Sequence, residues 1–249
     1  MTTESPEQVL TEVRRLRRRS KARAHGGVWL PVAVLAGLLL LSIALYTSPF
    51  RAPHEMTVAV PFWAGLPSEQ RDPTLSYAFW FVGTPAAFAL IAAWYRWRVR
   101  RVGVRVGWHW ALAAGLVALV ALAVLAAVPV ELPRDVPLGT LTADQPSLGS
   151  VLLDGVRTPL LPLAVATVVL GVAEGSRALV AAGGWVALVA YVQCTIGVAG
   201  VFAVLDGSRP SSFARYDTLP GPLVLAMAAP LVLFAATRAV RAPFRSGAR

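Results

Sequence analysis

The chain has 249 residues, of which 56% are hydrophobic and only 14% are charged, and its mean hydropathy is +0.62. Soluble domains carry about 25% charged residues, so a chain this apolar could not cover its surface in water, and an ordinary soluble domain is excluded. The net charge of +10 would suit nucleic acid in a soluble protein, but here the cations flank apolar runs, which favours a membrane as the partner and no nucleic acid.

We expect the first segment, residues 1–27, to form a basic amphipathic helix on the cytoplasmic side of a membrane. Ser5 and Pro6 form a helix start, and apolar residues recur at helical spacing among the cations. Each cation near anionic lipid contributes about 1 kcal/mol, so we expect this helix to lie on anionic headgroups. A nucleic-acid-binding or partner-binding arm is the alternative, but no aromatic residue or motif accompanies the charge. The arginines expected to face the lipid are Arg14, Arg15, Arg17, Arg18 and Arg19.

Six apolar stretches follow, and we expect each of them to cross the bilayer as a helix. The first has no charged residue and would be about 28 Å long, close to the ~30 Å hydrocarbon core. It is longer than the apolar core of a signal peptide, so we expect an uncleaved anchor. The fourth is the weakest, because it is short and has a charge at each end. The expected spans are 28–46, 77–95, 108–128, 158–173, 178–204 and 218–236.

The distribution of arginine orients these spans. Of the 23 Lys and Arg residues, 17 fall in the segments that an even number of crossings places in the cytoplasm. These segments include residues 1–27, a short basic loop at 96–105 and the basic tail 237–249. The sequence therefore predicts an all-α, six-helix bundle of the cell membrane, over residues 28–236, with both termini in the cytoplasm.

The apolar stretches carry no obvious chemistry. Ionisable groups deep in a bilayer cost about 2.5–3.5 kcal/mol each and mark pumps and relays, yet none of the six stretches contains Asp, Glu, Lys or Arg, and the one histidine, His109, lies at the inner end of the third stretch. No nucleotide-binding, zinc-protease or serine-hydrolase motif is present. The single cysteine, Cys194, cannot form an intrachain disulfide or a cysteine-cluster metal site. We therefore expect no cofactor, metal or catalytic residue.

Two features inside the stretches are open to a functional interpretation. Tyr191, Gln193 and Thr195, beside Cys194, form the most polar group within a span; they either contact a ligand or hydrogen-bond to neighbouring helices. Three prolines are expected to bend their helices, either as gating hinges or as static packing features. These prolines are Pro85, Pro162 and Pro230.

A row of small residues marks the third stretch. Small side chains at helical spacing let another helix approach closely, and packing of this kind drives helix association in lipid. The row consists of Ala111, Ala114, Gly115, Ala118 and Ala121.

Three short segments carry a family resemblance. They are the run Arg-Ala-His-Gly-Gly-Val-Trp-Leu-Pro at 23–31, Trp-Tyr-Arg at 94–96 and Arg-Thr-Pro-Leu-Leu at 157–161. In these segments, and over about half of its length, the chain resembles an uncharacterised family of multi-span membrane proteins from high-GC Gram-positive bacteria. The resemblance implies the multi-span architecture, and it implies no activity, because none is assigned to that family.

Three functions fit this sequence. The first is a non-enzymatic membrane subunit that associates with a membrane-protein partner or with itself. The second is a small transporter or permease subunit that a separate ATPase energises, because the chain has no nucleotide motif and no ion relay. The third is a membrane-embedded enzyme that uses carboxylates of the outer loops or a histidine, with His54, Glu55 and Asp72 as candidates.

Overall fold

The computed structural model describes residues 11–12, 27–51, 65–68, 70–102, 108–127, 155–156, 158–207 and 219–241. This part of the chain is helical, with one isolated antiparallel bridge between Tyr46 and Gln70, and the all-α prediction is confirmed for it. Most of the expected N-terminal helix, including Arg14, Arg15, Arg17, Arg18 and Arg19, and most of the basic tail lie outside the described residues. The elements are α2 (Trp29–Ser42), η1 (Ile43–Leu45), α3 (Pro73–Val102), α4 (Trp108–Ala127), α6 (Leu160–Ala173), α7 (Arg177–Thr195), α8 (Gly197–Leu205) and α9 (Pro220–Arg241).

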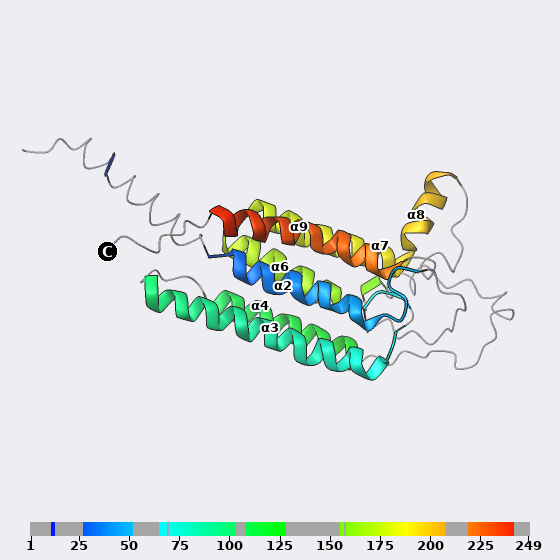
Figure 1. The fold of residues 1–249 in the computed structure, drawn as a ribbon, viewed down its shortest axis with the longest axis horizontal. Helices are drawn as coiled ribbons and strands as arrows, with labels where there is room; N and C mark the ends of the chain where they lie inside the picture. The colour runs from blue at the N-terminus through cyan, green and yellow to red at the C-terminus, as the bar shows by residue number, and fades with distance from the viewer. Residues whose placement is uncertain are drawn as a thin grey trace, which may run out of the picture.

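Six of these helices form an elongated bundle. Figure 1 shows α2, α3, α4, α6, α7 and α9 running along its long axis, while α8 turns away at one end. Helix pairs in contact include α6 with α7, α2 with α9, α4 with α6 and α3 with α4. We call the end where α2 begins and α3 ends the Trp94 end, and the opposite end, where α2 ends and α3 begins, the Tyr46 end.

Several of the helices are suited to a bilayer. Three are long and apolar enough to cross a membrane, namely Thr74–Arg100 of α3, Arg177–Thr195 of α7 and Pro220–Val240 of α9. Shorter apolar helices cover Trp29–Leu45, Ala113–Val124 and Leu160–Ala173. The described chain therefore contains helices that can span a membrane.

Local chemistry explains where the helices begin. The Asp72 carboxylate accepts a hydrogen bond from the Thr74 N–H at 2.7 Å, and Pro73 occupies the first helical position of α3, where its missing N–H costs nothing. Ser176 caps α7 in the same way by accepting from the Leu179 N–H. Between α6 and α7 the chain turns at Gly175, whose φ of 62° is a left-handed conformation that suits glycine.

Two glycines allow α6 and α7 to pack closely. A methyl group at Gly183 would lie 2.9 Å from the backbone nitrogen of Val168 and 3.0 Å from the carbonyl oxygen of Ala164. At Gly171 it would lie 2.7 Å from the backbone nitrogen of Val180. The two backbones therefore approach more closely than any other residue would allow, which is the geometry that small residues permit between membrane helices.

Two expected boundaries are wrong. The basic loop expected at 96–105 is helical as far as Val102, because arginine and tryptophan are compatible with a helix and no glycine interrupts the chain before Gly103. The fifth stretch, expected as one segment over 178–204, is divided into α7 and α8. Gly197 has a φ of 71°, and the Thr195 hydroxyl bonds back to its own helix, so the helix ends there.

The three prolines lie inside helices. Helix α3 continues through Pro85 and α9 continues through Pro230. Pro162 lies in the first turn of α6, where backbone N–H groups have no intrahelical partner. The hinge interpretation of these prolines stays a prediction.

One face of α3 forms part of the core along nearly the whole helix. Its buried residues recur every three or four positions, which is the period of one helix face. This face ends at the Trp94 end with a tyrosine and an arginine, so it carries polar groups into the bundle. The buried residues of this face are Ser76, Trp80, Thr84, Ala87, Phe88, Ile91, Tyr95 and Arg98.

Candidate functional site

The principal polar site lies at the Trp94 end, where α3 meets the turn between α6 and α7. The Tyr95 hydroxyl donates a hydrogen bond to the Glu174 carboxylate at 2.5 Å, and both residues are buried, at 2% and 7% exposure. The Arg98 side chain is 8% exposed and interacts electrostatically with Glu174. We call Tyr95, Arg98 and Glu174 the Glu174 cluster.

The start of α2 encloses the Glu174 cluster from another side. Arg98 packs so closely on Gly27 that a side chain there would collide with the guanidinium group. The Trp94 indole N–H donates to the Gly27 carbonyl oxygen at 3.1 Å, which ties the start of α2 to the last turns of α3. The cluster therefore joins three parts of the chain that are far apart in sequence.

The chemistry of this arrangement suits a structural contact that holds the helices together. A buried acid, a buried hydroxyl and a buried guanidinium stabilise one another when all three are present. Removal of one of them leaves a buried charge without its partner, so the desolvation cost of that charge is no longer offset. Among the described residues of this end, the ionisable groups of Tyr95 and Arg98 on α3 therefore interact with Glu174 in the turn after α6.

Sequence reasoning missed the Glu174 cluster. Arg98 was expected in a loop, and Glu174 was interpreted only as a charge at the end of a weak span. The signal that could have found the arginine is the helix period, because Arg98 continues the buried spacing of Ile91 and Tyr95 by three residues. The sequence contains no comparable signal for Glu174, which lies 79 residues from Tyr95.

The polar group predicted in the fifth stretch lies at the Tyr46 end. Gln193 and Thr195 are buried and Tyr191 is half-buried. The Thr195 hydroxyl donates within α7 to the Tyr191 carbonyl oxygen at 2.9 Å, and the Tyr191 ring and Thr195 methyl group pack against Gly155. Cys194 is also buried. The ligand and packing interpretations of this group both stay predictions.

Hydrogen bonds from side chains to the backbone organise the Tyr46 end. The Tyr46 hydroxyl accepts from the Leu66 N–H at 2.8 Å, and Arg71 donates to the Tyr46 carbonyl oxygen at 3.1 Å. The Thr158 hydroxyl donates to the Gly65 carbonyl oxygen at 3.0 Å. These contacts hold residues 65–66 and Arg71 against the segment that follows α2 and the segment that precedes α6.

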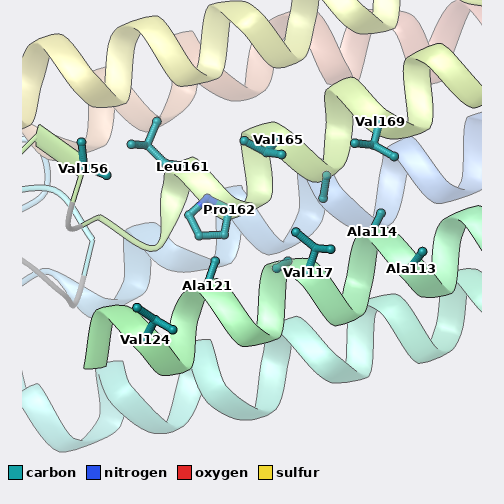
Figure 2. Close-up of a pocket in the computed structure, with 12 residues that line it drawn as sticks. Ala113, Ala114, Val117, Ala121, Val124, Val156, Leu161, Pro162, Val165 and Val169 are labelled. Atoms are coloured by element: carbon teal, nitrogen blue, oxygen red, sulfur yellow. The ribbon is translucent and has the colours of Figure 1, made fainter. Parts of the chain in front are cut away.

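An apolar groove runs between α4 and α6 and has a volume of about 620 Å³ (Figure 2). Part of the predicted small-residue row faces it, including Ala114, Ala118 and Ala121, whereas Gly115 packs against Phe88 of α3. None of the described side chains that line the groove is polar, so this lining suits apolar groups. Its lining consists of Ala113, Ala114, Val117, Ala118, Ala121, Val124, Val156, Leu161, Pro162, Val165, Ala166 and Val169.

Of the candidates for an outer-loop enzyme, only Asp72 lies among the described residues, and its carboxylate caps α3. His54 and Glu55 lie outside the described residues, so the enzyme hypothesis stays a prediction. Within the ranges that the structure describes, no three His, Cys, Asp or Glu residues gather as a metal site would require.

No family model, curated protein or solved structure matches this chain. The family resemblance drawn from three short segments therefore stays a prediction.

Proposed function

We propose that this chain is a non-enzymatic subunit of the cell membrane, which associates inside the bilayer with an apolar helix of another chain. In this proposal six helices cross the bilayer, both termini lie in the cytoplasm, and the other chain is a membrane-protein partner or a second copy. The groove between α4 and α6 is the observation that carries the proposal.

The groove supports a helix as the occupant because of its lining and its walls. Alanine and valine line most of it, and small side chains allow a second helix to approach closely enough for dispersion contacts to hold it. Val117, Val124 and Val165 on its rims are 59%, 58% and 48% exposed, so an entering helix would contact both walls. The Glu174 cluster is consistent with a non-enzymatic role, since Glu174 accepts a hydrogen bond from Tyr95 and interacts electrostatically with Arg98.

Site-specific photocrosslinking in native membranes tests the proposal. A photoreactive p-benzoylphenylalanine replaces Val117 or Val165 on the groove, and Leu188 of α7 or Leu233 of α9 as matched controls. The control residues are 55% and 66% exposed and are not among the residues that line the groove. We expect one discrete protein adduct from the groove positions, with its crosslinked peptide in an apolar helix, and none from the controls.

The outcomes separate helix association from the permease alternative. Lipid adducts alone at all four positions would overturn helix association. Equal protein adducts at groove and control positions would show non-specific encounter and would also overturn it. An adduct with the membrane subunit of an ATPase complex would replace the proposal with the permease alternative.

A further inference from the structure

Three tryptophans form a ladder at the Trp94 end. Trp94 stacks on Trp97 with ring centroids 4.9 Å apart and an interplanar angle of 26°, and Trp29 meets Trp94 edge-on at 6.2 Å. The hydrogen bond from Trp94 to the Gly27 carbonyl oxygen fixes the middle ring. Trp97 is 44% exposed, so an indole whose position is fixed by stacking stands on the surface.

Two arginines stand beside this exposed indole. Arg96 and Arg100 are exposed and four residues apart, so they share one face of α3, and Trp97 lies next to that face. Helix α3 contains no acidic residue, and Glu174 at this end is buried in the Glu174 cluster. Of the other described acids, Asp72 caps the start of α3 at the Tyr46 end, Asp206 follows α8, and Glu12 belongs to the described pair 11–12. Since Arg96 and Arg100 are themselves exposed, their positive charge faces outward.

An exposed apolar strip leads from this charged face along α3. Its residues are spaced by three or four positions, so they lie above one another on the helix surface. From its far end to Trp97 the strip is about 22 Å long at 1.5 Å per residue, which suits an extended hydrocarbon chain. The strip consists of Val82, Ala86, Ala89, Leu90 and Ala93.

We propose that Arg96, Arg100 and Trp97 bind the headgroup of an anionic phospholipid, whose acyl chain lies on the strip from Ala93 to Val82. Guanidinium groups bind phosphate through paired charge-assisted hydrogen bonds, and indoles prefer the headgroup level of a bilayer. The adjoining strip selects a lipid over a soluble phosphate, because only a lipid carries an apolar chain beside its charge. This is a discrete site, separate from the groove between α4 and α6 and from the predicted N-terminal basic helix.

The test measures lipid retention by the full chain. The protein is purified in mild detergent and incubated with equal amounts of phosphatidylglycerol and phosphatidylcholine. Native mass spectrometry then measures how much of each lipid stays bound to the protein. We expect the wild type to retain phosphatidylglycerol preferentially. The double variant Arg96→Gln, Arg100→Gln should bind it about thirtyfold more weakly, as expected for two arginines facing anionic lipid.

A charge-matched control distinguishes a discrete lipid-binding site from general attraction of anionic lipid to the positive charge at this end of the bundle. Arg177→Gln with Arg238→Gln removes the same charge from exposed positions at the same end of the bundle. We expect this control to retain phosphatidylglycerol within about threefold of the wild type. Equal losses in the two double variants would overturn the site, and so would equal retention of the two lipids by the wild type.

Two further measurements test the role of the guanidinium groups and the role of the apolar strip separately. If the glutamine variant does not fold, Arg96→Lys with Arg100→Lys keeps the charge and removes the planar guanidinium fork, and unchanged lipid preference in it would overturn paired phosphate recognition. Displacement of phosphatidylglycerol by millimolar inorganic phosphate would show that the apolar strip contributes nothing. Photocrosslinking at the groove is independent of both results, so failure of the lipid site and failure of helix association are distinguishable.

Discussion

Replacement of Tyr95 by phenylalanine should destabilise the bundle measurably. The change removes a hydroxyl that donates to the buried Glu174 carboxylate and leaves the ring in place. A hydrogen bond to a charged group contributes about 1.5–3 kcal/mol. For a chain of this size, about 2–4 °C of melting temperature corresponds to each kcal/mol, so we expect a decrease of about 3–12 °C. Thermal unfolding of the purified protein in mild detergent measures it.

The control for this prediction is Tyr191→Phe. Tyr191 is half-buried, and its hydroxyl has no hydrogen bond to another described residue, so its loss should change stability by less than about 0.5 kcal/mol. Glu174→Gln should cost more than Tyr95→Phe, toward about 3–5 kcal/mol, because it leaves the Arg98 guanidinium buried without its opposing charge. If both tyrosine variants melted at the wild-type temperature, the Glu174 cluster would not fasten the bundle.

Three further predictions follow from close packing and burial. Gly183→Ala should lower the free energy of unfolding by about 1–3 kcal/mol because its methyl group would meet the backbone of α6, whereas Gly184→Ala, which meets open space, should be neutral or stabilising in the same thermal assay. Gly27→Ala should destabilise by a similar amount through collision with a guanidinium group, and Gly37→Ala, with nothing nearby, is its control. Cys194, at 0% exposure, should resist maleimide labelling until denaturant is added; rapid labelling of the folded protein would contradict its burial.

The helices of this protein could be predicted from sequence because hydrocarbon length and backbone satisfaction leave few choices. An apolar run in lipid must form a helix, since every N–H and C=O needs a partner within the segment. Helix ends were harder to predict. The arginines after Tyr95 suggested a loop, yet long side chains can extend toward water from a continuing helix, and α3 reaches Val102. The break at Gly197 depends on one left-handed residue, and an apolar pattern does not reveal it.

The candidate site was less predictable because it depends on pairing between distant segments. Thr195 was singled out as a polar residue within a span, but its hydroxyl bonds to its own helix. The residues that do join elements, Tyr95 and Glu174, were each at the edge of an expected span, and neither was predicted to pair with the other. A sequence shows which residues are costly to bury, but it does not show which of them will meet.

The arginines of α3 show how one helix can use the same residue type for opposite purposes. Arg98 lies two positions from both Arg96 and Arg100, and two positions rotate a side chain by about 200°, which is enough to exchange core for surface. The inward arginine is matched by Glu174, so this pair adds no net charge to its end of the bundle. The positive charge that would orient the chain in a membrane therefore belongs to exposed arginines such as Arg96 and Arg100. A simple count of arginines treats all three alike, whereas the helix period places one in the core of the bundle and two on its exposed surface.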